Sequence, residues 1–197
     1  MNGLALHAVI ETAWRLEGVP PWPVTAPDAE FTRLSDITAA HCGFVMAFIA
    51  EYNSVAFTQQ TPPQQILHGL AGDEEIVIPG GIEIISGERV IRPGCCSDLE
   101  EWSAWPTLHA TMSIPYLGHD PDPWLEPLGH GVRIWSDDRD APAVFQLMVL
   151  WPEWDAAVAR LRAQVTHFVD QLDDWSHSVA PVAAEHAMQR IRARLSV

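Results

Sequence analysis

The sequence contains no lysine, so all 11 of its basic residues are arginines. With 26 acidic residues the formal net charge is −15, counting histidines as neutral. A protein that binds nucleic acid needs a basic surface that displaces counterions from phosphates. An acidic surface instead favours solubility, or the electrostatic attraction of a basic partner. We therefore expect no nucleic-acid partner and, where a protein is bound, a basic one.

Lysine is absent while arginine and alanine are common, which is typical of a GC-rich coding genome, and we expect a bacterial source. Cysteine is also scarce: the chain has three, an odd number. The first residues lack the basic start and unbroken apolar run of a secretory segment. Odd, unpaired cysteines without such a segment indicate a reducing compartment. We expect a cytoplasmic protein.

Long apolar runs are missing as well. The longest, residues 42–50, is half of the roughly 18 residues that a membrane span requires, so we expect no membrane association. The sequence also lacks the glycine-rich nucleotide-binding motifs, the Gly-x-Ser-x-Gly turn of serine hydrolases and the His-Glu-x-x-His zinc motif. These absences mean that nothing in the sequence obliges a cofactor, and we expect none.

The N-terminal segment is expected to form a helical arm. Apolar residues recur at helical spacing over residues 3–17, and Gly18 is placed to end the helix. Residues 19–27 contain four prolines, which favour an extended connector. We expect residues 1–27 to be an arm that docks on the body of the protein or on a second copy, giving a homodimer.

The middle of the chain carries the β signal. Two hairpins are predicted, 82–85 with 88–91 and 124–128 with 132–135, and further strands at 76–78, 111–116 and 143–151. Helices are predicted before this region, from about residue 35, and after it, from Pro152 and from Pro181. Residues 1–197 are expected to form a single α+β domain. Its antiparallel sheet of about five to six strands would pack against the N-terminal and long C-terminal helices.

Two adjacent cysteines, Cys95 and Cys96, lie where a predicted strand ends and a predicted helix begins. The segment Ser97–Glu100 fits a capping box, which would start that helix directly after the cysteines. A helix N-terminus lowers a thiol pKa, so Cys96 is a candidate nucleophile, with His119 and Asp120 as candidate acid–base partners. The alternative is that both cysteines are small buried apolar side chains.

Two candidate metal sites follow from residue type. His41, Cys42, Cys95 and Cys96 offer zinc ligands, although their spacing matches no zinc-ribbon or finger pattern. Asp120, Asp122 and Asp137 offer carboxylates for a divalent cation. The alternative for these aspartates is turn formation, because Asp-Pro sequences are common turn formers.

Nine tryptophans are many for 197 residues. Trp102, Trp105, Trp124 and Trp135 lie close together in the sequence, and tryptophan is enriched at binding hot spots. We predict that they contribute to an interaction surface. The alternative is that they pack in the core, which aromatic residues also dominate.

In size, acidity and expected α+β pattern, the chain resembles bacterial immunity proteins that neutralise toxins, a similarity of general character that no single motif carries. The first functional hypothesis is accordingly a non-enzymatic protein that binds another protein, in the manner of an immunity protein or adaptor. The alternative hypothesis is a small thiol-dependent or metal-assisted hydrolase that uses Cys96 with His119 and Asp120.

Overall fold

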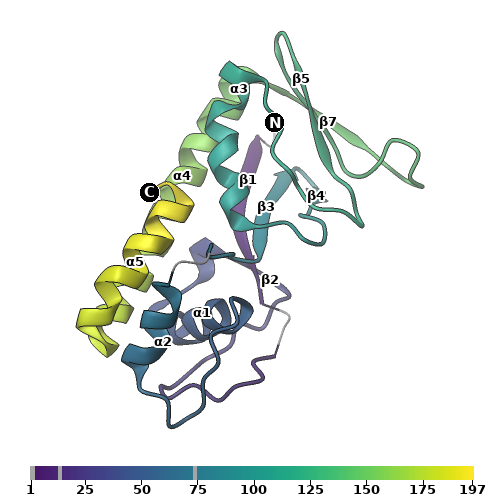
Figure 1. The fold of residues 1–197 in the computed structure, drawn as a ribbon. Helices are drawn as coiled ribbons and strands as arrows, with labels where there is room; N and C mark the ends of the chain where they lie inside the picture. The colour runs from purple at the N-terminus through teal and green to yellow at the C-terminus, as the bar shows by residue number, and fades with distance from the viewer. Residues whose placement is uncertain (1–2, 13–14, 73–74) are drawn as a thin grey trace. The chain divides into compact units, whose positions relative to one another are not determined.

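The computed structural model describes residues 3–12, 15–72 and 75–197 (Figure 1). These residues form two compact units, one of residues 1–9 with 79–164 and the other of residues 10–78 with 165–197. That they form the expected single domain stays a prediction. The strands are β1 Leu4–Glu11, β2 Phe31–Arg33, β3 Gly80–Ser86, β4 Arg89–Ile91, β5 Trp124–Leu128, β6 Gly131–Trp135 and β7 Gln146–Leu150. The α-helices are α1 Ala39–Tyr52, α2 Pro63–Leu70, α3 Leu108–Thr111, α4 Trp151–Val179 and α5 Pro181–Leu195, with 3₁₀ helices η1 Leu34–Asp36 and η2 Leu99–Thr107.

The fold class is α+β, as predicted, and the long C-terminal helix is present. In the described residues, however, the strands divide between two antiparallel sheets, with strand orders β2-β1-β3-β4 and β5-β6-β7. The single sheet of about five to six strands is therefore not what forms. The chain between β4 and β5 is occupied by η2, α3 and irregular backbone, and β5, β6 and β7 pair with one another.

The β5-β6-β7 sheet is an antiparallel meander in the first unit. Trp124 pairs with Trp135 across β5 and β6, and Arg133 pairs with Met148 across β6 and β7. Its buried side chains are Leu125, Val132, Ile134, Leu147 and Val149. They alternate along each strand with half-buried or exposed residues, which is the pattern of a sheet with one face in a core. The second predicted hairpin and the later strand are confirmed.

The β3-β4 hairpin is confirmed too. Ser86 pairs with Arg89, so the turn consists of Gly87 and Glu88, one residue later than the predicted Ser86-Gly87 turn. Gly87 has a φ of 62°, a conformation that a two-residue hairpin turn requires and that glycine adopts without strain.

The predicted N-terminal helix is wrong, because residues 4–11 form strand β1. Leu4, Leu6 and Ala8 are buried while the residues between them are less so, which is the period-two pattern of a strand. Side chains of α4 bind the β1 backbone: Leu4 N donates to Glu153 Oε1 at 2.7 Å, and Gln164 Nε2 donates to the Leu6 carbonyl at 3.0 Å. In a short window, apolar residues fit helical and strand periods alike. The expected helical arm is therefore not what forms, and the homodimer stays a prediction.

The strand predicted at 111–116 is also wrong. Thr111 ends α3, Met112 takes a left-handed conformation with φ 56°, and the following residues are irregular. Met112, Ile114 and Tyr116 are all about half exposed, so the segment buries no apolar face that would favour pairing. Proline at position 115 also lacks the N–H that a strand would use.

In the second unit, α1 is buried on all sides from Cys42 to Ala50, as expected of a helix that is apolar all round. Gly43 lies where a Cβ would be 2.8 Å from the Pro23 carbonyl oxygen and 3.1 Å from the Trp22 ring. Trp22 also donates from Nε1 to the Gly43 carbonyl at 2.9 Å and packs edge-on against Trp175. The glycine therefore lets the proline-rich segment lie directly on the helix.

No helix within residues 3–12, 15–72 and 75–197 is both long and apolar enough to cross a membrane.

A candidate thiol–imidazole site

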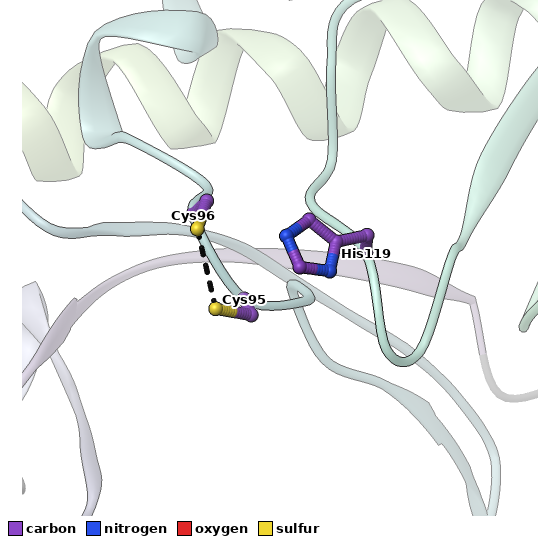
Figure 2. A group of neighbouring side chains, drawn as sticks. All are labelled: Cys95, Cys96 and His119. Carbon is purple, nitrogen blue, oxygen red and sulfur yellow. Dashed lines mark hydrogen bonds between the residues drawn. The ribbon is translucent and has the colours of Figure 1, made fainter.

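Cys95, Cys96 and His119 form one cluster in the first unit (Figure 2). Their two sulfur atoms and an imidazole nitrogen all lie within 4.8 Å of one another. The Sγ atoms of Cys95 and Cys96 are 3.3 Å apart, and neither is in a disulfide. All three residues are exposed, so the cluster is open to small molecules and ions in solution. The alternative prediction of two buried cysteines is wrong.

Backbone pairing brings these distant residues together. Cys95 N donates to the His119 carbonyl at 2.6 Å, and His119 N donates back to the Cys95 carbonyl at 3.0 Å. A third bond runs from Gly94 N to the Leu117 carbonyl at 2.8 Å. The two segments thus form a short antiparallel bridge that fixes His119 beside the cysteines without a full strand on either side.

Two glycines allow the segments to approach so closely. A Cβ at Gly94 would lie 2.6 Å from His119 N, and one at Gly118 would lie 2.6 Å from the Gly94 Cα. Gly118 also has a φ of 94°, which residues with a side chain rarely adopt. Gly94 directly precedes the cysteine pair and Gly118 directly precedes the histidine. A glycine directly before each of the paired residues is the feature of the sequence that could have indicated this close approach.

The backbone at Cys96 turns both sulfurs to one side. Successive side chains of extended backbone point in opposite directions, but Cys96 has a φ of 62°. This left-handed conformation is costly for a residue other than glycine and persists only where neighbouring structure enforces it. Cys96 lies between two bridges, Cys95 with His119 and Pro79 with Asp98. Gly80 N also donates to the Ser97 carbonyl at 3.1 Å, so the chain is tied down on both sides of the turn.

The imidazole of His119 is held by its neighbour. Its Nδ1 lies 3.1 Å from Oδ2 of Asp120, and the other ring nitrogen is the one that faces the thiols in Figure 2. The bond to Asp120, followed by one to Cys96, raises the pKa of His119 above its ordinary value. The contact with the Cys95 thiol, followed by the bond to His119, lowers the pKa of Cys96. Both shifts favour a thiolate beside a charged imidazole.

The predicted capping box does not form. The helix that follows is the 3₁₀ helix η2, its N-cap is Asp98, and no side-chain bond caps it. The sequence predicts that Cys96 lies at a helix N-terminus and that this position lowers the pKa of its thiol. The structure gives the shift a different cause, the neighbouring Cys95 thiol and His119.

The aspartates predicted as metal ligands serve different purposes. Oδ1 of Asp137 accepts hydrogen bonds from the backbone N–H of Asp122 at 2.9 Å and of Asp138 at 2.8 Å, which is turn formation. Asp120 is bound to His119 instead. In the described part of the chain, the ligand atoms that converge are those of Cys95, Cys96 and His119. The carboxylate triad Asp120, Asp122 and Asp137 is therefore not assembled.

His41 and Cys42 do not belong to this cluster. His41 Nδ1 accepts from Thr38 N at 3.2 Å, at the start of α1. The Cys42 thiol is buried and donates towards the Thr38 and Gln171 carbonyls at 3.5 and 3.7 Å. Burial therefore removes the Cys42 thiol from the predicted zinc set, and Cys95 and Cys96 converge with His119 instead.

The four candidate tryptophans separate into two pairs. Trp102 and Trp105 are 1% exposed, so they belong to the core and offer no surface. Trp124 and Trp135 are half-buried and stack with ring centroids 5.6 Å apart. The guanidinium of Arg139 lies over both rings, 4.4 Å from the first and 5.1 Å from the second. The predicted four-tryptophan surface is thus reduced to this pair, already covered in part by an arginine.

Comparison with known proteins found no matching family model, no matching curated protein and no matching solved structure.

Proposed function

We propose that this protein binds a thiophilic metal ion of the Zn²⁺ type through Cys95, Cys96 and His119. The observation that carries the proposal is the convergence of two thiol sulfurs and an imidazole nitrogen within 4.8 Å. Thiolate and imidazole are the ligands that zinc takes from proteins, and soft thiolates select against Mg²⁺ and Ca²⁺.

The distances suit one tetrahedral ion. Zn–S bonds of about 2.3 Å and Zn–N bonds of about 2.0–2.1 Å place two ligand atoms roughly 3.5–3.8 Å apart. The sulfurs of Cys95 and Cys96 are 3.3 Å apart, so small side-chain rotations would bring them to that spacing. The bridge to His119 and the turn at Cys96 supply these positions before any ion binds, which reduces the ordering cost of binding.

Asp120 supports the same function from outside the ligand set. A metal-binding histidine usually holds its second ring nitrogen against a carboxylate, which fixes the tautomer and strengthens the ligand. The Nδ1 of His119 makes this contact with Asp120. Three protein ligands on an exposed surface leave a fourth position for water or substrate. A set of two cysteines and one histidine is among those that catalytic zinc sites use, so metal-assisted hydrolysis is the activity to assay first.

The test is a titration of the reduced 197-residue protein with Zn²⁺, and with Co²⁺ as a spectroscopic probe. We expect one equivalent to bind and the Co²⁺ form to show thiolate-to-metal charge-transfer absorption. Cys95→Ser, Cys96→Ser and His119→Ala should each lower affinity by at least about 100-fold, since even outer-shell changes cost 10–100-fold. Cys42→Ser, which removes the remaining thiol, is the matched control and should bind like wild type. No binding, or equal binding by all four variants, would contradict the proposal.

A second candidate function uses the same residues without metal. Cys96 contacts His119, and His119 contacts Asp120. In thiol hydrolases a nucleophilic cysteine, a histidine base and an acid that orients the histidine follow one another in the same way. This is the alternative hypothesis from the sequence. Cys95→Ser separates the two functions: it removes a metal ligand but leaves nucleophile, base and acid in place. Ester hydrolysis that survives in this variant and in the presence of a chelator would favour thiol catalysis.

Binding of a protein partner stays a prediction. The net charge of −15 still favours a basic partner, and the Trp124–Trp135 pair is the part of the predicted surface that is accessible. Loss of a specific partner on Trp124→Ala, with binding retained on Cys96→Ser, would place that function away from the thiol cluster.

A further inference from the structure

We propose that Cys95 and Cys96 form a reversible disulfide with each other, and that this oxidation releases the metal ion. The inference rests on the proposed function for its second half, the loss of metal, but not for its first. It adds a redox control to the site: the reduced protein binds the ion and the oxidised protein does not.

The geometry favours a bond between these two sulfurs. They are 3.3 Å apart in the reduced protein, and a disulfide requires about 2.0 Å, so closure needs a movement of little more than 1 Å. The left-handed backbone at Cys96, with φ 62°, already turns the two side chains to the same side. Because both cysteines are exposed, an oxidant can reach them.

The same geometry makes the bond easy to reduce. Cα atoms of adjacent residues are about 3.8 Å apart, whereas most disulfides join Cα atoms about 4.4–6.8 Å apart. A ring closed between neighbours is therefore strained, and strained, exposed disulfides are the labile and regulatory ones. A permanent structural bond would be expected between well-separated, buried cysteines instead.

The chemistry needs an oxidant, which we take to be a low-molecular-weight disulfide such as oxidised glutathione. One protein thiolate attacks a sulfur of that disulfide, forming a mixed disulfide and releasing one small thiol. The second protein thiolate then attacks the protein sulfur of the mixed disulfide and releases the other small thiol. Two electrons and two protons pass from Cys95 and Cys96 to the oxidant. Neither sulfur is then a thiolate, so two of the three metal ligands are lost.

The absence of lysine simplifies the experiment, because trypsin then cleaves only after arginine. Arg92 is followed by Pro93, which blocks cleavage, so one peptide of residues 90–133 holds both Cys95 and Cys96. Cys42 lies in a different peptide, residues 34–89. Metal-free protein is equilibrated with oxidised and reduced glutathione, remaining thiols are alkylated, and both peptides are measured by mass spectrometry.

We expect peptide 90–133 to become lighter by two hydrogens and to resist alkylation, while Cys42 is still alkylated. Reduced glutathione should reverse the change, and the oxidised protein should bind Zn²⁺ at least about 100-fold more weakly than the reduced protein. Cys95→Ser and Cys96→Ser should stop at a mixed disulfide with glutathione, and Cys42→Ser should oxidise like wild type. A persistent glutathione adduct on the wild-type peptide, or a disulfide between two chains, would overturn the switch.

The two proposals fail separately. If the disulfide forms but the reduced protein binds no Zn²⁺, the metal function is wrong, and with it the release of metal. If the reduced protein binds Zn²⁺ and no disulfide forms, the redox control alone is wrong.

Discussion

His119 Nδ1 lies 3.1 Å from the Asp120 carboxylate, while the same histidine is paired through its backbone with Cys95. His119 therefore connects the thiol pair of Cys95 and Cys96 with the carboxylate of Asp120, which orients its ring. Because Asp120 follows His119 directly in sequence, the carboxylate is delivered by the same bridge that delivers the imidazole.

Asp120→Asn should weaken Zn²⁺ binding by roughly 10–100-fold, the usual cost of changing an outer-shell partner, without unfolding the protein. The Asp120 side chain is 93% exposed, so the substitution removes little packing. Calorimetry with Zn²⁺ measures the affinity, and a denaturation curve provides the stability control. Asp138→Asn, in an exposed turn outside the cluster, is the matched charge control and should leave affinity unchanged. Equal losses in both variants would indicate a general charge effect.

Gly118→Ala should lower the free energy of unfolding by at least about 3 kcal/mol, because a left-handed φ and a clash with backbone act together. Its φ is 94°, and its Cβ would lie 2.6 Å from the Gly94 Cα. Gly129→Ala is the control: a Cβ there meets nothing within 4 Å, and its cost should stay within roughly 1 kcal/mol. Urea denaturation of the two variants gives the comparison. Similar stabilities would mean that the close approach of the two segments is not needed for folding.

Trp105→Ala should cost about 3–5 kcal/mol, the usual range for a large aromatic residue removed from a core. Trp105 is 1% exposed and stacks on Trp154 with ring centroids 5.0 Å apart. Trp124→Ala should cost much less, about 1 kcal/mol for its stacking contact, because Trp124 is half-buried. Denaturation midpoints measure both, and Trp105→Phe gives a milder variant if the alanine protein does not fold. A larger loss from Trp124 than from Trp105 would reverse our division of the tryptophans.

The sequence predicts the fold where local patterns are strong. Both hairpins, β7 and the long helix from Trp151 have clear turn or helix-start signals and form as expected. At residues 4–11 the pattern is ambiguous. Hydrogen bonds between the backbone of this segment and the side chains of Glu153 and Gln164, which lie far away in sequence, favour the strand. The division of the strands between two sheets depends on non-local pairing that no local pattern specifies.

The candidate site shows the same distinction. The sequence indicates Cys96 by its place before a predicted helix and His119 and Asp120 by residue type, and the structure brings the three together. The sequence offers Cys95 as a zinc ligand, but in a set with His41 and Cys42 and without His119. Its contact with Cys96 depends on a left-handed φ that the sequence gives no reason to expect at a cysteine. Cys42 is a candidate zinc ligand in the sequence because it neighbours a histidine, but its place on the buried helix α1 removes it from solvent.

Cys42 should react with thiol reagents far more slowly than Cys95 and Cys96. Burial raises the pKa of Cys42 from 9.0 to about 11, and the thiolate is the reacting form. A rise of that size lowers the thiolate fraction near neutral pH by roughly 100-fold, and exclusion of the reagent from a buried position slows the reaction further.

A chromogenic disulfide reagent should therefore show two fast thiols and one slow one, and the slow rate should increase as the pH rises towards 11. Cys42→Ser should lack the slow phase, and denaturant should merge the phases in wild type. A slow phase that persists in Cys42→Ser would place the protected thiol in the cysteine pair and contradict the exposure on which both proposals depend.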